Sequence, residues 1–271
     1  MRPARMAGAR VVTTLPLAVG IAEHTRAGRI ASRLARVNCI GVTIMFDLQA
    51  EVRRRAVHEA GHAVFIWRGD AGLPPFEEVL VSPHAHDRDE NLPPLRLADG
   101  RLHYAAGTVI LRDLRQRVPD VRGMTGLSRK DRRAAIKRAK AEADAAVVGL
   151  LAGPVVEEHF RALRDGDGRY FNWEEEAVFN ETGERSRDVT EALAIVEKEL
   201  CRGWRQSSSY MDAAVARIEE KIDTDPRYLR AIHAVAGALE KRHRLDRYEA
   251  FDTMREAWNS GAACTAENDN R

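Results

Sequence analysis

Paired cysteines, a strong net charge and long apolar runs are all missing from this sequence, and each absence excludes a class of protein. The three cysteines form no C-x-x-C pair, which argues against a disulfide framework and a thiolate zinc site, so we expect a reducing, cytoplasmic setting. The formal net charge is only +2, so the composition indicates neither a nucleic-acid partner nor a membrane surface. No apolar run approaches the roughly 20 residues that span a bilayer, so we expect no transmembrane segment.

A phosphate-binding loop and an internal repeat are missing as well, so nothing in the chain indicates ATP hydrolysis. The length of 271 residues suits one large domain or two small ones. We expect an N-terminal extension over residues 1–44, a core domain over residues 45–258 and a disordered tail over residues 259–271. The extension carries seven arginines and one acid. A disordered extension fits it better than a targeting peptide, because polar residues and a proline interrupt its apolar run.

The run AVHEAGHAVF, which contains His58, Glu59 and His62, carries the strongest functional signal. Apolar residues recur at helical spacing through residues 48–67, so the run is predicted to lie on a helix with both histidines on one face. Two imidazoles presented in this way can bind one zinc ion, and Glu59 beside them can take a proton from a bound water. The alternative is a pair of unliganded histidines on a polar face, which is weaker because the complete pattern is rare by chance.

A small β element is predicted after this helix. The stretch Phe76–Ser82 alternates as a short strand does. Residues 102–114 contain either a second strand, around Gly107–Leu111, or the beginning of a helix. His84 and His86 lie between them in a polar loop, where solvated side chains are a better interpretation than a second metal site.

A long helix is predicted to begin at Ser128, with Asp131 three residues later in the manner of a capping box. Its first turns are rich in lysine and arginine, which is one signature of a nucleic-acid patch. Acids are interleaved and no aromatic residue is available to stack on bases, so the pattern favours a solvated helical face.

Two further acids have positions that need an explanation. Glu157 follows the buried run Ala145–Val156, in which Pro154 is expected to kink or restart the helix. An exposed carboxylate at a helix end explains Glu157 as well as the ligand-orienting role that the family resemblance below implies. Asp188 lies on the apolar face of a helix that begins at Ser186, where an acid must be paired or bound to metal. A helix-start aspartate that favours the helix dipole explains Asp188 equally well.

Three more helices are predicted toward the C-terminus, over about residues 208–222, 226–244 and 247–258. The second of them has a strong start signal, with Asp225 as N-cap and Pro226 at the first helical position. The predicted fold class is mainly α, a helical zinc-peptidase domain with a small β element after the HExxH helix.

Three stretches together resemble the peptidase domain of the FtsH-type membrane-anchored AAA proteases. AVHEAGHAVF resembles the zinc-site helix of that family. LLAGPVVEEHF (Leu150–Phe160) resembles the family's buried helix, which ends in paired acids. ERSRDVTEAL (Glu184–Leu193) resembles the segment that holds the family's third zinc ligand. The resemblance covers about residues 46–258. The chain departs from the family in having no ATPase module, no transmembrane anchor and a longer separation between His62 and Asp188.

The resemblance implies that His58, His62 and Asp188 bind Zn²⁺, that Glu59 is the general base and that Glu157 orients a ligand. The expected activity is that of a zinc metalloendopeptidase that cleaves peptides or unfolded protein segments without ATP. The alternative is a catalytically silent zinc-binding or regulatory protein with a peptidase fold.

Overall fold

The computed structural model describes residues 48–70, 75–83, 93–103, 107–111, 126, 128–168, 171–178, 186–201 and 203–260, all within one unit, Phe46–Arg271. The expectations for the N-terminal extension, for His84 and His86, and for the tail beyond residue 260 lie outside the described residues.

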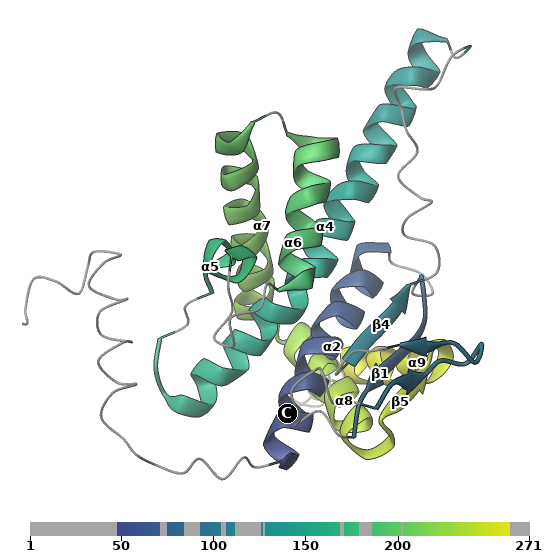
Figure 1. The fold of residues 1–271 in the computed structure, drawn as a ribbon, viewed down its shortest axis with the longest axis vertical. Coiled ribbons are helices and arrows are strands. Elements are labelled where there is room, and N and C mark those ends of the chain that lie inside the picture. The colour runs from purple at the N-terminus through teal and green to yellow at the C-terminus, as the bar shows by residue number, and fades with distance from the viewer. Residues whose placement is uncertain are drawn as a thin grey trace, which may run out of the picture. The chain divides into compact units, whose positions relative to one another are not determined.

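The described chain is mainly helical, as predicted (Figure 1). Its helices are α2 (Leu48–Asp70), α4 (Arg129–Asp165), α5 (Trp173–Val178), α6 (Arg187–Ile195) with the π-helical turn η4 (Val196–Leu200), α7 (Trp204–Thr224), α8 (Pro226–Arg242) and α9 (Arg247–Asn259). Within the described part of the chain, every helix is too short or too polar to pass through a bilayer.

Local sequence signals account for where several helices begin and end. The Ser128 side chain accepts a hydrogen bond from the Asp131 amide at the start of α4, as expected for an N-cap. Helix α4 ends at Gly166, whose φ of 68° is the left-handed conformation that glycine adopts without strain. Asp225 is the N-cap of α8, and Pro226 follows it in the first turn of that helix. Asp246 forms a capping box with Glu249 at the start of α9.

Helices α2 and α4 form the centre of the domain and approach each other closely. A Cβ added at Gly61 of α2 would lie 2.9 Å from the Ala152 carbonyl oxygen of α4. A Cβ added at Gly149 of α4 would lie 2.8 Å from Ile66 of α2. The two glycines therefore allow backbone-to-backbone packing that a larger residue would prevent. Helix α8 packs on α2 as well, so that α2 is surrounded over most of its length.

The structure excludes one of the two outcomes expected at Pro154, a restart of the helix. Helix α4 does not restart at Pro154 but runs without interruption from Arg129 to Asp165. The proline removes one backbone donor, and the buried residues Leu151, Val155 and Val156 on either side hold the helix in place. The chain before Ser186 contains the short helix α5, which the buried Trp173 anchors to the core.

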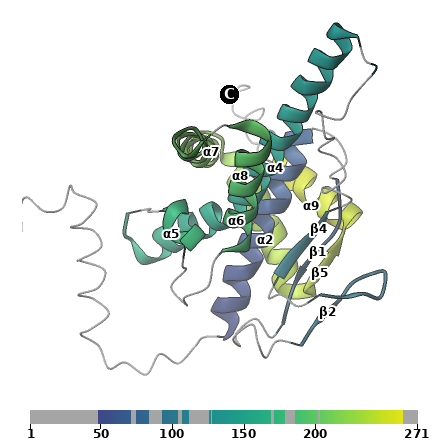
Figure 2. The same ribbon diagram turned by 45° about the horizontal axis from the view of Figure 1, so that its top comes forward.

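A three-stranded antiparallel sheet lies beside α2 and α9, in the strand order β4-β1-β5 (Figure 2). Strand β1 (Phe76–Val81) confirms the predicted strand, and β4 (Gly107–Leu111) shows that the ambiguous stretch is a strand and not a helix. Strand β5 (Arg244–Asp246), which pairs with β1 through Val79 and Leu245, was not predicted, because three residues between two helices give no strand pattern. A separate hairpin joins β2 (Leu95–Arg96) to β3 (Leu102–His103).

Candidate metal centre

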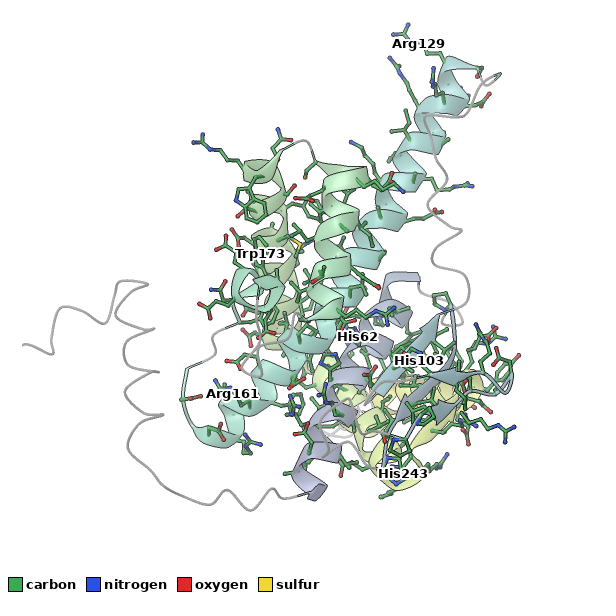
Figure 3. The ribbon with its side chains drawn as sticks, viewed as in Figure 1. His62, His103, Arg129, Arg161, Trp173 and His243 are labelled. Carbon is green, nitrogen blue, oxygen red and sulfur yellow. The ribbon has the colours of Figure 1, made fainter. Side chains whose placement is uncertain are left out.

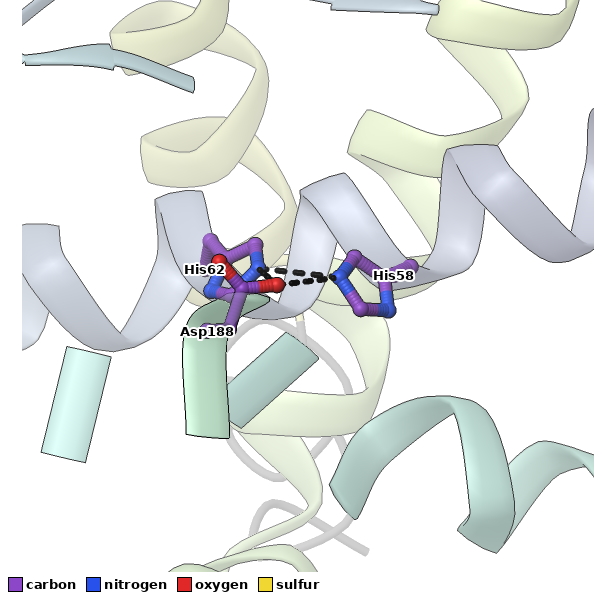
Figure 4. Close-up of side chains that lie close together, drawn as sticks. All are labelled: His58, His62 and Asp188. Atoms are coloured by element: carbon purple, nitrogen blue, oxygen red, sulfur yellow. Dashed lines mark hydrogen bonds and ion pairs between the residues drawn. The ribbon is translucent and has the colours of Figure 1, made fainter. Parts of the chain in front are cut away.

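Helix α2 places His58 and His62 on one face, one turn apart, and turns their rings toward each other (Figure 4). The ring centroids are 4.7 Å apart in an edge-on arrangement, and the two Nε2 atoms are 3.0 Å apart. The helix is predominantly buried on this side, so both rings lie against the core. The i, i+4 spacing of the sequence therefore produces two imidazole nitrogens that converge on one point.

Asp188 is brought to the same point from the first turn of α6. Its Oδ2 atom lies 3.1 Å from Nε2 of His58 and 3.4 Å from Nε2 of His62. Asp188 thus lies in the first turn of its helix, as one interpretation of the sequence has it, and its carboxylate is also paired with the histidines, as the other requires. His58, His62 and Asp188 form the group of side chains, among the described residues, that could hold a metal ion.

The outer nitrogens of both imidazoles are held by acceptors. Nδ1 of His62 lies 2.7 Å from the Gly149 carbonyl oxygen, and Nδ1 of His58 lies 2.8 Å from the Glu157 carboxylate. Neither partner can donate, so in a neutral imidazole the proton resides on Nδ1 in both cases. The lone pairs of both Nε2 atoms then face each other and the Asp188 oxygen, with no donor between them. Three acceptors directed at one point require a cation there, either a metal ion or a proton.

The spacing of these three atoms suits a metal ion. Zinc bonds of about 2.0–2.1 Å in a tetrahedral arrangement place neighbouring ligand atoms roughly 3.3 Å apart. The observed separations of 3.0, 3.1 and 3.4 Å are close to that value. The three atoms would occupy one face of a tetrahedron, and the fourth position would remain available to water or substrate.

Glu157 makes the contact that a metal-bound histidine needs on its outer nitrogen. Besides His58, its carboxylate binds Arg54, whose guanidinium also binds Glu51 at 2.8 Å. Burial acts to raise the pKa of Glu157, but the hydrogen bond and charge of His58, together with Arg54, outweigh it and lower the pKa to about 2. Glu157 is therefore a carboxylate at every ordinary pH, and it fixes the tautomer of His58.

The same contacts act on His58. Burial acts to lower its pKa, but hydrogen bonds with Asp188 and Glu157 outweigh it and raise the pKa to about 10 in the absence of metal. Without an ion, His58 therefore keeps a proton at neutral pH. A metal ion must displace this proton, so metal binding is expected to strengthen as the pH rises.

Glu59 lies next to the two histidines but does not share their face. It is almost fully buried, and a Cβ added at Gly107 of β4 would lie 2.6 Å from its Oε1 atom. Burial raises the pKa of Glu59, which favours its protonated form more than in an exposed glutamate. The carboxyl group is thus buried against the first residue of a strand, near enough to both histidines for their charges to act on its pKa.

Two participants were not identified from the sequence. Arg54 lies four residues before His58 on the same helical face, a spacing that could have indicated a shared environment. Gly153 gave no signal at all: a Cβ there would lie 2.6 Å from Cε1 of His62 and would overlap the ring at Nε2. The His62 ring occupies the space that the missing side chain leaves.

We expect Gly153→Ala to disturb the centre through this overlap, by displacing the His62 ring. Metal affinity should fall by at least about tenfold, and thermal unfolding should show a loss of about 1–3 kcal/mol, the usual cost of overpacking. Gly237→Ala is the matched control, because Gly237 is also helical and an added Cβ there meets nothing within 4 Å. That control should be neutral or stabilising by up to about 1 kcal/mol. Equal metal binding by both variants would show that the His62 position is not restricted.

A second pair of variants distinguishes the roles of the Asp188 and Glu157 carboxylates in metal binding. Asp188→Asn should weaken metal binding by at least about tenfold, because it replaces an anionic ligand by a neutral one. Glu157→Gln should weaken it by a similar or smaller factor, since the amide can no longer accept bonds from His58 and Arg54 with full charge. Isothermal titration with zinc measures both. If Glu157→Gln lost the metal and Asp188→Asn kept it, Glu157 would be the ligand.

A scan of the chain against models of known protein families finds no match, and a search of the curated proteins finds no similar sequence. The function must therefore be inferred from the geometry of the centre.

Proposed function

We propose that this protein is a zinc-dependent metallopeptidase that hydrolyses peptide bonds in peptides or unfolded segments without ATP. The observation that carries the proposal is the convergence of His58, His62 and Asp188, with both outer histidine nitrogens fixed and a buried carboxyl group, Glu59, beside them.

The donor set favours zinc over the hard divalent cations. Two imidazole nitrogens and one carboxylate oxygen at tetrahedral spacing are characteristic of catalytic zinc, whereas Mg²⁺ and Ca²⁺ require mostly oxygen ligands. Two histidines and one carboxylate also bind Fe(II) in oxygenases. The buried Glu59 favours hydrolysis over that alternative, because a hydrolytic reaction needs a group that accepts and returns a proton.

A zinc ion held by these residues would polarise the substrate carbonyl and lower the pKa of an attacking water. Glu59 would accept the proton of that water and later give it to the leaving amine. The raised pKa of Glu59 suits the second of these steps, since a carboxyl group with an ordinary pKa donates poorly at neutral pH. Glu157 and the Gly149 carbonyl keep the two histidines in one orientation during the reaction.

Strand β4 supports the choice of an extended substrate. It is at the edge of the three-stranded sheet, where among the described residues it pairs only with β1, and its first residue, Gly107, abuts Glu59. An extended peptide can add to such an edge through backbone hydrogen bonds, which would bring a peptide bond to the carboxyl group. Most segments of a folded protein already use their backbone groups in its own secondary structure, so peptides and unfolded segments are the expected substrates.

The test is to measure metal content and cleavage on the same preparation. We expect about one zinc per chain, and we expect cleavage of a library of unfolded peptides that stops with a chelator and returns with added zinc. Bound zinc without cleavage by the wild-type protein would favour the alternative, a binding or regulatory protein that keeps the metal. Stoichiometric iron in place of zinc would favour an oxygenase.

A further inference from the structure

The N-terminal turns of α4 hold a concentration of positive charge that the proposed active site does not use. Residues Arg129–Lys140, called here the basic segment, contain seven of the 43 lysines and arginines of the chain and one of its 41 acids. They extend beyond the neighbouring helices, with Arg129 at the far end (Figure 3). All seven basic side chains are exposed.

These cations differ from those elsewhere in having no counter-ion among the residues that the structure describes. Most arginines elsewhere in the described helices form ion pairs, for example Arg161 with Glu158, Arg217 with Asp144 and Arg242 with Glu249. None of the seven basic residues of the segment is in an ion pair with any residue in the described part of the chain. The segment therefore has positive charge that is available to a partner.

The acids that are interleaved with these cations in the sequence either bind other described residues or lie on another side of the helix. Asp131 accepts a hydrogen bond from the Ser128 hydroxyl at 2.6 Å and belongs to the cap of the helix. Asp144 binds Tyr210 and, at 2.7 Å, Arg217. At 100° per residue, six of the seven cations fall within about 160° of the helix circumference, and Asp131 and Glu142 point away from that arc. The interleaving seen in the sequence does not neutralise the basic face.

We propose that the basic segment binds double-stranded nucleic acid without sequence preference, by laying its cationic face against the phosphates. A helix of twelve residues is about 18 Å long, and that length of duplex carries about ten phosphate charges. An α-helix with its side chains also fits a major groove of about 12 Å. Because the cations are distributed over a broad arc of the helix, they can reach both walls of such a groove.

The composition of the segment disfavours other polyanions. It contains no aromatic residue on which the bases of a single strand could stack. Its apolar members are three alanines and the partly exposed Ile136, which give too little apolar surface for a helix that lies in a membrane interface. A duplex requires neither, because phosphate contacts supply the affinity.

The full-length protein can be titrated against a fluorescent 20-base-pair DNA of random sequence at 50–200 mM KCl. With four or five phosphate contacts, we expect micromolar affinity at the low salt concentration and a loss of a few hundred-fold at the high one. The triple variant Arg133→Gln, Lys137→Gln, Lys140→Gln should lose at least about tenfold in affinity at 50 mM KCl, and the slope of log K against log salt should fall by about two to three. Glutamine is a good helix former, so the helix should persist in circular dichroism.

The matched control is Lys241→Gln, Arg242→Gln, Arg255→Gln, which removes the same charge from exposed positions of α8 and α9. It should retain the affinity and the slope of the wild type. Equal losses in both triple variants, or no duplex binding below about 100 µM at 50 mM KCl, would overturn the proposal. So would tighter binding of a single-stranded 20-mer, of phosphatidylserine vesicles or of polyglutamate than of the duplex.

Discussion

Replacing His58 or His62 by alanine is expected to abolish stoichiometric metal binding. Each substitution removes one of three ligand atoms that lie within 4.8 Å of one another. Loss of an outer-shell partner alone typically costs 10–100-fold in affinity, so loss of a ligand should cost at least about 100-fold. Metal analysis after dialysis and a competition titration with a chromogenic chelator measure the effect. Peptide cleavage should fall with the metal.

His233→Ala is the appropriate control, because His233 is exposed on α8 and lies outside the cluster. It should bind as much metal as the wild type. Full retention of metal by both His58→Ala and His62→Ala would contradict the assignment of the centre. Retention by only one would indicate that Asp188 and the other histidine suffice for binding.

Glu59→Gln is expected to separate chemistry from metal binding. Removal of a general base typically costs 10²–10⁴-fold, so the rate of peptide cleavage should fall by at least about 10²-fold. The metal should remain, because Glu59 is not in the ligand group. The fold should remain too: glutamine has nearly the same shape in the tight space beside Gly107, and burial already favours a neutral group at this position. Steady-state kinetics, zinc content and thermal unfolding should be measured on one preparation.

Glu197→Gln, which changes an exposed glutamate of η4, provides the comparison and should cleave at the wild-type rate. If Glu59→Gln cleaved peptides as fast as this control, Glu59 would not be the base. In that case the proton would have to be taken by another group, and the proposed mechanism would be wrong.

Features encoded by local spacing were predictable from the sequence. The helix bearing His58 and His62 follows from an apolar periodicity within about twenty residues, and the caps at Ser128 and Asp225 follow from single side chains and their neighbours. Strand β1 was recognised for the same reason.

Features that depend on contacts between distant segments were not predictable. Asp188 is 130 residues from His58, and helical periodicity alone placed it equally well at a helix start. The requirement for glycine at position 153 exists only because a ring from another helix fills that space. The continuity of α4 through Pro154 likewise depends on the packing around it, which outweighs an intrinsic helix-breaking tendency.

The position of Asp188 also has a mechanical consequence. An ion bound by α2 and α6 would be a cross-link that closes a loop of about 130 residues, and the unfolded chain could offer it only the two histidines of one short stretch. Binding to the folded chain alone raises its stability with the logarithm of the free ion concentration. The nine-residue α6, which is too short to be stable by itself, should gain the most, so its amides should exchange hydrogen faster than those of α2 when the ion is removed.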